Sequence, residues 1–169
     1  SCTTSAYTVG GTISGLNGTV TIQNNGGDNL AISADGAFTF ATSVTDGNAY
    51  VVSVLTQPSN PNQICSVTNG GGTLAGANIT GVSISCVTTT YTIGGTVSGL
   101  SGSGLVLQNN TGDDLPISAD GSFTFPTALD DTSTYAVSVL TQPSNPNQIC
   151  SVSNGGGSLA GGNVTSVFV

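Results

Sequence analysis

The sequence contains no lysine, arginine or histidine, and its 8 acidic residues, all aspartates, give a formal net charge of -8 at neutral pH. Without cationic side chains, the chain cannot neutralise phosphate groups or bind an anionic membrane surface electrostatically. Histidine general bases, lysine Schiff bases and histidine-containing triads are also excluded. We therefore expect no nucleic-acid partner, no cofactor and no enzyme activity. The one enzyme alternative left is a glycosidase that uses two aspartates.

Long apolar runs are absent too, since no stretch of about eighteen apolar residues is present to span a membrane, and we expect no membrane insertion. Charged residues make up 5% of the chain and hydrophobic residues 37%, which is not the composition of a disordered chain. The first residues, Ser1 and Cys2, resemble neither a signal peptide nor an N-terminal lipidated cysteine. We expect a mature, unlipidated product that is extracellular or at the cell surface.

The chain contains two copies of one module. Residues 52–67 and 137–152 are identical, and the sequences around them align with an offset of 84 residues near the start of each copy and 85 residues farther on. Such self-similarity at a fixed period is typical of repeat proteins. We expect module 1 at residues 1–86 and module 2 at residues 87–169.

The two ends of the chain are in register with the repeat. The two offsets add up to the chain length, so Val169 corresponds to Ile84. The residues that would follow Val169 in the repeat match Ser1 and Cys2 of another copy. The sequence therefore resembles two periods of a continuous repeat.

Apolar residues alternate with small polar residues in both modules, which is the period of a strand with one buried face. Asp35 and Gly36, like Asp120 and Gly121, lie between such segments and predict hairpins with type I′ turns, in which both central residues have positive φ. The pattern predicts an all-β fold, with one immunoglobulin-like antiparallel β-sandwich of about seven strands in each module and no helix. The alternating positions of module 1 include Tyr7, Val9, Ile13, Val20, Ile22, Leu30, Ile32, Phe38, Phe40, Tyr50, Val52 and Val54.

Four motifs carry a resemblance to known proteins. Residues 10–16 read Gly-Gly-Thr-Ile-Ser-Gly-Leu, residues 22–28 read Ile-Gln-Asn-Asn-Gly-Gly-Asp, residues 34–40 read Ala-Asp-Gly-Ala-Phe-Thr-Phe, and residues 50–54 read Tyr-Val-Val-Ser-Val. With their counterparts in module 2, they resemble the tandem immunoglobulin-like modules of bacterial secreted and surface proteins, which are similar to carboxypeptidase-regulatory-like and Cna-B-like prealbumin sandwiches. The resemblance implies a spacer, stalk or fibre function without catalytic residues. Some of these families lock each module with a lysine-to-asparagine isopeptide bond, which this lysine-free chain cannot form.

Cysteine can provide the covalent reinforcement instead. Cys65 and Cys86 lie on either side of the glycine-rich residues 69–72, and residues 64–67 are expected to form a strand next to the one that contains Cys86. We predict an intrachain disulfide between these two cysteines. Closing a loop of about 20 residues would stabilise module 1 by about 3 kcal/mol in the chain-entropy model.

Module 2 contains Cys150 in the matching place, but no cysteine follows it. We hypothesise that Cys150 of one chain bonds to Cys2 of the next chain in a head-to-tail homopolymer. An intrachain bond between Cys2 and Cys150 is an alternative that requires folded-back modules, because the Cα atoms of a disulfide lie within about 7 Å of each other. Otherwise both thiols stay free, or the chain is an arbitrary fragment of a longer protein.

Two acidic pairs and four sequons are further candidate sites. Oxygen-rich clusters can bind Ca²⁺, but both acidic pairs are expected in loops, and solvated loop carboxylates are the favoured interpretation. The weak metal candidates are Asp113, Asp114, Asp130 and Asp131. The candidate N-glycosylation sites, each in an Asn-x-Thr pattern, are Asn17, Asn78, Asn109 and Asn163.

The sequence thus predicts a structural subunit of an extracellular filament or cell-surface stalk, with other copies of itself as partners. The alternative is an adhesin or an array of carbohydrate-binding modules, for which the partners would be glycans. The chain has no tryptophan and only 4 tyrosines, and two of these, Tyr7 and Tyr91, begin alternating strands. This scarcity of aromatic side chains argues against the alternative.

Overall fold

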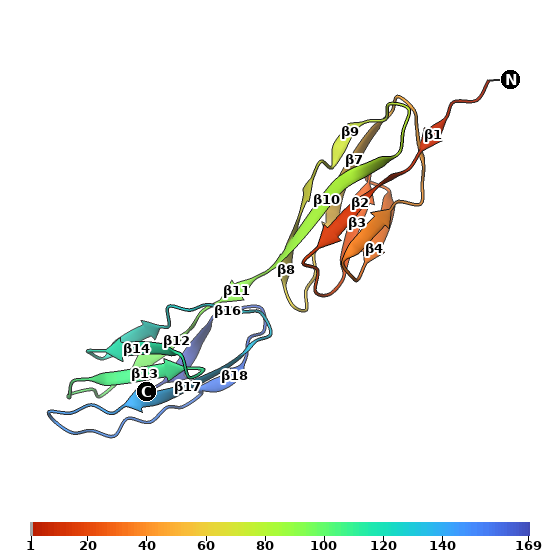
Figure 1. Ribbon diagram of the computed structural model, residues 1–169. Coiled ribbons are helices and arrows are strands. Elements are labelled where there is room, and N and C mark those ends of the chain that lie inside the picture. Colours follow the sequence, from red (N-terminus) through yellow and green to blue (C-terminus); the bar gives the residue numbers. More distant parts are fainter. Residues whose placement is uncertain (1) are drawn as a thin grey trace. The chain divides into compact units, whose positions relative to one another are not determined.

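The computed structural model describes residues 2–169, which form strands, turns and bends but no helix (Figure 1). This confirms the all-β prediction. None of the described residues belongs to a helix that could cross a membrane. The chain divides into two compact units: unit 1 extends to Thr89, and unit 2 is Thr90–Val169. Each unit has its own hydrophobic core.

Unit 1 is a sandwich of two four-stranded sheets. One sheet has the order β5-β2-β10-β8 and consists of β2 (Val9–Ser14), β5 (Gly36–Thr39), β8 (Gln63–Thr68) and β10 (Ile79–Thr88). The other has the order β4-β3-β7-β9 and consists of β3 (Val20–Asn24), β4 (Asp28–Ile32), β7 (Ala49–Thr56) and β9 (Gly71–Thr73). Two short strands, β1 (Ala6–Tyr7) and β6 (Val44–Thr45), pair with each other.

The core of unit 1 lies between these sheets, because alternate residues of each strand point inward. Val20 and Ile22 of β3 are fully buried, and they pack in one cluster with Val9 and Ile13 of β2 from the facing sheet. The aromatic rings of Phe38 and Phe40 add an edge-to-face contact with ring centroids 5.9 Å apart. The alternation predicted from the sequence is therefore confirmed.

Strand pairing in the described residues is antiparallel apart from one parallel pair in each unit, β2 with β10 and β12 with β19. The parallel pair of unit 1 needs glycine. A Cβ atom on Gly11 would lie 1.8 Å from the backbone oxygen of Val82 in β10, and one on Gly10 would lie 2.4 Å from the backbone oxygen of Phe38. Gly10 and Gly11 therefore allow the neighbouring strands to approach on either side of β2.

The predicted hairpins at Asp35 and Gly36 and at Asp120 and Gly121 are wrong. In unit 1 the two residues connect β4 to β5, which lie in different sheets and do not pair. Gly36 has a φ of 141°, but the φ of Asp35 is not positive, so the turn is not of type I′. The pair marks a crossing between the two layers of the sandwich, and the same holds in unit 2 for β14 and β15.

Unit 2 repeats this architecture with one strand fewer. Its three-stranded sheet, in the order β15-β12-β19, consists of β12 (Ile93–Val97), β15 (Gly121–Thr124) and β19 (Val164–Phe168). Its four-stranded sheet, in the order β14-β13-β17-β18, consists of β13 (Leu105–Asn109), β14 (Asp113–Ile117), β17 (Thr134–Thr141) and β18 (Gly156–Ser158). β11 (Thr90–Tyr91) pairs with β16 (Leu129–Asp130).

The missing strand is the counterpart of β8. Residues 148–152 repeat residues 63–67 letter for letter, but they form no strand. Only the next residue, Ser153, makes an isolated bridge, with Phe168. Identical sequences therefore have two different structures in the two units.

The close approach of β2 and β10 can be tested by substitution. We expect Gly11→Ala to destabilise unit 1 by about 2 to 3 kcal/mol, because the added methyl group forces the backbones apart. Gly81→Ala is the matched control, since Gly81 also lies in β10 and a Cβ atom there meets nothing within 4 Å. The measurement is urea unfolding of both variants and the parent chain. Equal losses in the two variants would contradict this role of Gly11.

Candidate functional site

The predicted disulfide between Cys65 and Cys86 is present in unit 1. The two cysteines lie directly opposite each other in the antiparallel ladder of β8 and β10. Both are buried and belong to the core cluster of unit 1. The disulfide therefore cross-links β8 to β10, the last strand of unit 1, within one sheet.

A glutamine holds the backbone of Cys65 from the side away from β10. The N–H of Cys65 donates to Oε1 of Gln57 at 2.8 Å, and Nε2 of Gln57 donates to the carbonyl oxygen of Cys65 at 3.0 Å. Because the N–H and C=O of one residue share a side of a strand, those of Ile64 and Ser66 face β10 instead. Cys65 and Cys86 thus form a non-hydrogen-bonded pair, in which the side chains approach closely.

A second glutamine, Gln63, ties the end of β10 to the loop that follows β2. It is 3% exposed. Its Nε2 donates to the carbonyl oxygen of Gly15 at 2.9 Å and to Oγ1 of Thr88 at 3.2 Å, and its Oε1 accepts a hydrogen bond from the N–H of Asn17 at 2.7 Å. Thr88 is the residue directly opposite Gln63 in the ladder.

In unit 2, Gln142 and Gln148 make hydrogen bonds like those of Gln57 and Gln63, although residues 148–152 form no strand. The N–H of Cys150 donates to Oε1 of Gln142 at 2.8 Å, and Nε2 of Gln142 donates to the carbonyl oxygen of Cys150 at 3.1 Å. Nε2 of Gln148 donates to the carbonyl oxygen of Gly99 at 2.8 Å. The hydrogen bond to a threonine hydroxyl that Gln63 makes has no counterpart at Gln148.

We call residues 148–152 the open edge of unit 2. Within the described chain, the backbone groups of Ile149 and Ser151 make no hydrogen bond. The side chain of Ile149 is 92% exposed, whereas its counterpart Ile64, beside β10, is 64% exposed. Cys150 has a free thiol and packs at the margin of the unit 2 core. The open edge is thus an unpaired strand site with a thiol at its centre.

The other free thiol belongs to Cys2, which is exposed. Residues 2–5, which we call the N-terminal segment, form no strand and extend away from the sandwich of unit 1 beyond β1 (Figure 1). They match residues 86–89, in which Cys86 and Thr88 pair with β8. Ser1, the first residue of the register match, lies outside the described residues.

The acidic pairs do not form a metal site. Within residues 2–169, no group of three or more acidic, cysteine or histidine side chains could hold a metal ion. Asp113 and Asp114 begin strand β14, so their expected loop position is wrong. Oδ2 of Asp113 accepts a hydrogen bond from the N–H of Thr127 at 3.2 Å, and Oδ1 of Asp114 accepts one from Nε2 of Gln108 at 2.7 Å.

The second acidic pair is structural as well. Asp130 ends strand β16 and is exposed, but Asp131 is only 4% exposed, so the expectation of a solvated carboxylate is wrong for Asp131. Its Oδ1 accepts a hydrogen bond from the N–H of Gly161 at 2.8 Å. In unit 1 Asp46 makes the same bond to Gly76 at 2.8 Å, so this aspartate is part of the repeat and fixes a turn.

Asp35 and Asp120, predicted as hairpin residues, anchor a neighbouring loop instead. The two carboxylate oxygens of Asp120 accept hydrogen bonds from the N–H groups of Gly99 at 2.8 Å and Leu100 at 2.7 Å. Asp35 makes the same pair of bonds in unit 1. Each aspartate thus links the crossing between the sheets to the loop that follows β2 or β12.

The four sequons differ in accessibility. Asn17, Asn78 and Asn163 are exposed. Asn109 is 1% exposed, and its Oδ1 accepts a hydrogen bond from the N–H of Ala136 at 3.1 Å. The folded unit therefore does not present Asn109 for glycosylation.

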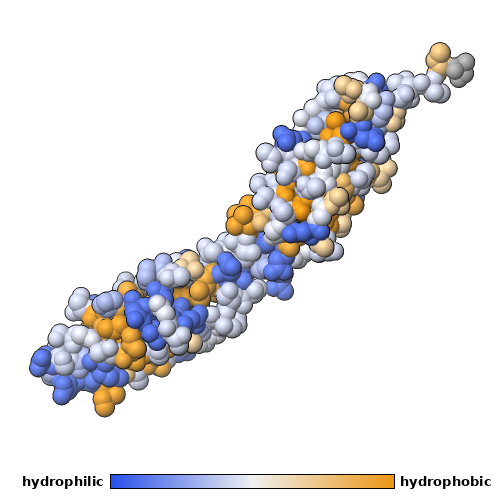
Figure 2. Space-filling model, in the orientation of Figure 1, coloured by the Kyte–Doolittle hydropathy of each residue, from blue (hydrophilic) through white to orange (hydrophobic). Residues whose placement is uncertain are grey.

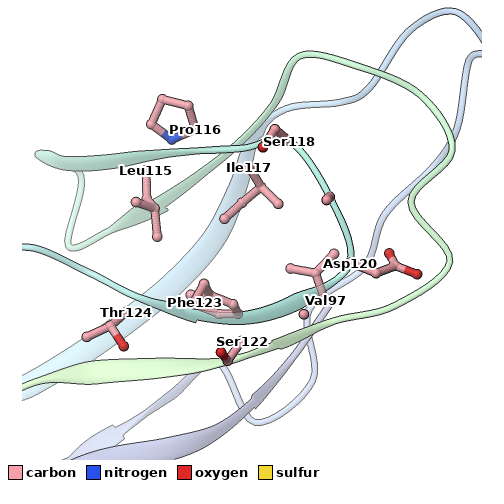
Figure 3. A pocket seen from close by; sticks show the side chains of 11 residues that line it. Val97, Leu115, Pro116, Ile117, Ser118, Asp120, Ser122, Phe123 and Thr124 are labelled. Carbon is pink, nitrogen blue, oxygen red and sulfur yellow. The ribbon is translucent and has the colours of Figure 1, made fainter.

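A groove of about 360 Å³ lies between β14 and β15 of unit 2. Leu115, Ile117 and Phe123 point into it in Figure 3, and Asp120 lies at its rim. Both carboxylate oxygens of Asp120 already accept backbone hydrogen bonds. The groove is therefore a gap between two edge strands, lined by apolar side chains and by the hydroxyl residues Ser118, Ser122 and Thr124, and the carboxylate at its rim is already hydrogen-bonded.

Comparisons with known proteins add no assignment: no protein-family model matches the chain, and no curated protein shows significant sequence similarity to it.

The anchoring role of Asp120 gives a measurable expectation. Asp120→Ala should destabilise unit 2 by about 2 kcal/mol, because two N–H groups lose their charged acceptor. Asp130→Ala, which removes an exposed carboxylate from the same unit, should change stability by less than about 0.5 kcal/mol. Thermal unfolding followed by circular dichroism measures both. A loss in Asp120→Ala no larger than that in the control would contradict the anchoring role.

Proposed function

We propose that the protein is a structural subunit of an extracellular filament or surface stalk, in which β-sandwich units are joined head to tail. The observation that supports this most is the contrast between the two identical stretches. In unit 1, residues 63–67 are closed by a strand and a disulfide. In unit 2, residues 148–152 stay open, with a free thiol at Cys150.

The link in this proposal is a disulfide between Cys150 of one copy and Cys2 of the next. Its formation removes one hydrogen atom from each thiol. A small-molecule disulfide such as oxidised glutathione, or an oxidised protein dithiol, accepts the two electrons and two protons and is itself reduced to two thiols. The product is one new S–S bond between two copies.

This link uses a different surface on each partner, so the contact is heterologous. After two copies join, one still has a free N-terminal segment and the other still has a free open edge. Further copies can therefore add at either end, and a heterologous contact that does not close into a ring produces a filament.

Several properties of the chain suit a location outside the cell. The disulfide between Cys65 and Cys86 would persist in an oxidising compartment, where such bonds are common. The absence of lysine and arginine removes every cleavage site for trypsin-like proteases. Most of the face visible in Figure 2 has intermediate hydropathy, as expected for a surface of neutral polar residues. The resemblance to tandem modules of secreted proteins points the same way.

The alternative function, an adhesin or a carbohydrate-binding array, has less support. The groove beside Phe123 is lined by no tryptophan or tyrosine that could stack on a sugar ring, and Phe123 itself is buried.

Denaturing gels without and with reductant test the proposal. We expect oxidised protein to give a ladder of multiples of 16.5 kDa that collapses to the monomer on reduction. Cys2→Ser alone and Cys150→Ser alone should each remain monomeric, because each retains one partner of the link, and a mixture of the two should stop at a covalent dimer. A double variant, Cys65→Ser with Cys86→Ser, is the matched control and should keep the ladder if it folds.

Two results would contradict this proposal. A single monomer band under oxidising conditions would exclude the covalent filament. Dimers formed by Cys2→Ser alone would show a symmetric bond between two Cys150 thiols and would exclude the head-to-tail arrangement.

A further inference from the structure

We infer that the N-terminal segment of one copy forms the missing strand of unit 2 in another copy, antiparallel to the open edge. This inference rests on the proposed function, and it adds to the disulfide a strand pairing with a defined register. It treats the contact between two copies as a repeat of the pairing between β8 and β10 that unit 1 makes within itself.

The register follows from the ladder of unit 1, where Cys86, Val87 and Thr88 lie opposite Cys65, Ile64 and Gln63. In the repeat, Cys2, Thr3 and Thr4 correspond to Cys86, Val87 and Thr88 of β10. Cys150, Ile149 and Gln148 correspond to Cys65, Ile64 and Gln63 of β8. Cys2 then lies opposite Cys150, Thr3 opposite Ile149 and Thr4 opposite Gln148.

The backbone of the open edge is prepared for such a strand. Gln142 occupies the N–H and C=O of Cys150, as Gln57 occupies those of Cys65. The backbone groups of Ile149 and Ser151 make no hydrogen bond in the described chain. An unpaired strand of this kind binds an extended peptide through backbone hydrogen bonds. In the register of unit 1 the added strand would supply Thr3 as the partner of Ile149 and Ser1, the residue before the N-terminal segment, as the partner of Ser151, and it would leave Cys150 unchanged.

The hydrogen bonds of the Gln148 side chain also support the N-terminal segment as the added strand. Its Nε2 already donates to Gly99, and its Oε1 accepts from Ser101 and Gly102. The one interaction of Gln63 that Gln148 lacks is the bond to a threonine hydroxyl. In the inferred register, Thr4 brings a hydroxyl to this position.

The donor and the acceptor of the next backbone hydrogen bond in the ladder are also present in the inferred pairing. In unit 1 the N–H of Thr89 donates to the carbonyl oxygen of Asn62 at 2.9 Å. The corresponding groups are the N–H of Ser5 and the carbonyl oxygen of Asn147. The carbonyl oxygen of Ser5 accepts a hydrogen bond from Asp46 at 2.9 Å within its own unit, so its N–H is the group left to pair.

The direction of the strands favours a second copy as the source of the segment. In each unit the chain begins at the start of β2 or β12 and leaves along the strand parallel to it, β10 or β19. The open edge of unit 2 therefore lies at the end of the unit where the chain leaves, opposite to the end where it begins. A second copy can bring its N-terminal segment to that end directly.

A self-completed chain tests whether the edge accepts this strand. In a Cys2→Ser background, the residues Ser-Cys-Val-Thr-Thr-Thr, copied from residues 85–90, are appended to Val169. We expect a disulfide between the added cysteine and Cys150, and a rise of about 10 °C in the unfolding midpoint of unit 2. The matched control carries one additional glycine before the appended residues, which shifts the register and turns each side chain to the opposite face. Equal midpoints in the extended chain and its control would overturn the inferred register.

Hydrogen exchange on the oxidised polymer tests the contact between copies. Relative to the Cys2→Ser monomer, the amides of Ile149 and Ser151 should exchange at least about tenfold more slowly, because they become hydrogen-bonded. The amide of Cys150, already bonded to Gln142, should change little. This alternation supports strand pairing.

Each contrary result has its own meaning. A polymer linked through Cys2 and Cys150 in which Ile149 and Ser151 exchange as fast as in the monomer would overturn the inference and leave the proposed function standing. A monomer with an intrachain bond between Cys2 and Cys150 would overturn the second copy as the source of the strand, and with it the filament. A chain that forms neither bond would overturn both proposals.

Discussion

The pairing of β8 with β10 is the interaction on which the difference between the two units depends. Where the partner strand is present, residues 63–67 form a regular strand, Gln63 is buried and Cys65 is closed in a disulfide. Where the partner is absent, the identical residues 148–152 form no strand and the thiol stays free. Whether a segment forms a strand depends on its hydrogen-bonding partner as much as on its own residues. Because the two stretches have the same residues, the difference between them shows the contribution of the partner strand.

Local interactions explain why the open edge keeps its form without a partner. Gln142 is eight positions before Cys150 and holds its backbone with two hydrogen bonds, and Gln148 remains bonded to the loop after β12. These contacts lie within the repeated stretch or within unit 2, so they form in both copies. The cost of ordering the backbone at Cys150 is therefore met within unit 2, before any strand is added.

The sequence predicted the features that follow from period and repetition. Alternating apolar residues revealed the strands, and the spacing of Cys65 and Cys86 around the glycine-rich residues identified their disulfide. The Asp35 and Gly36 turn was misjudged because a hairpin signal is local, whereas the choice between pairing β5 with β4 or with β2 depends on the packing of two sheets. The burial of Asp131 could not be predicted either, since its hydrogen-bond partner, Gly161, is far away in the sequence. Nor could the role of Gln57, which depends on which side of the strand the backbone groups of Cys65 face. One signal for the glutamines was present: they lie in the stretch that is identical in both modules.

The charge of the chain limits how copies can attract each other. Every copy carries a formal charge of -8 and no cationic side chain, so no ion pair can form between side chains of two copies, and the long-range force between them is repulsive. Any contact must therefore depend on short-range interactions, which in the open edge are backbone hydrogen bonds, the side-chain amide of Gln148 and the thiol of Cys150. Salt would screen the repulsion over a Debye length of about 8 Å at physiological ionic strength without weakening these bonds. Association through the open edge should thus become stronger as the salt concentration rises, which is the opposite of the behaviour of interfaces held by ion pairs.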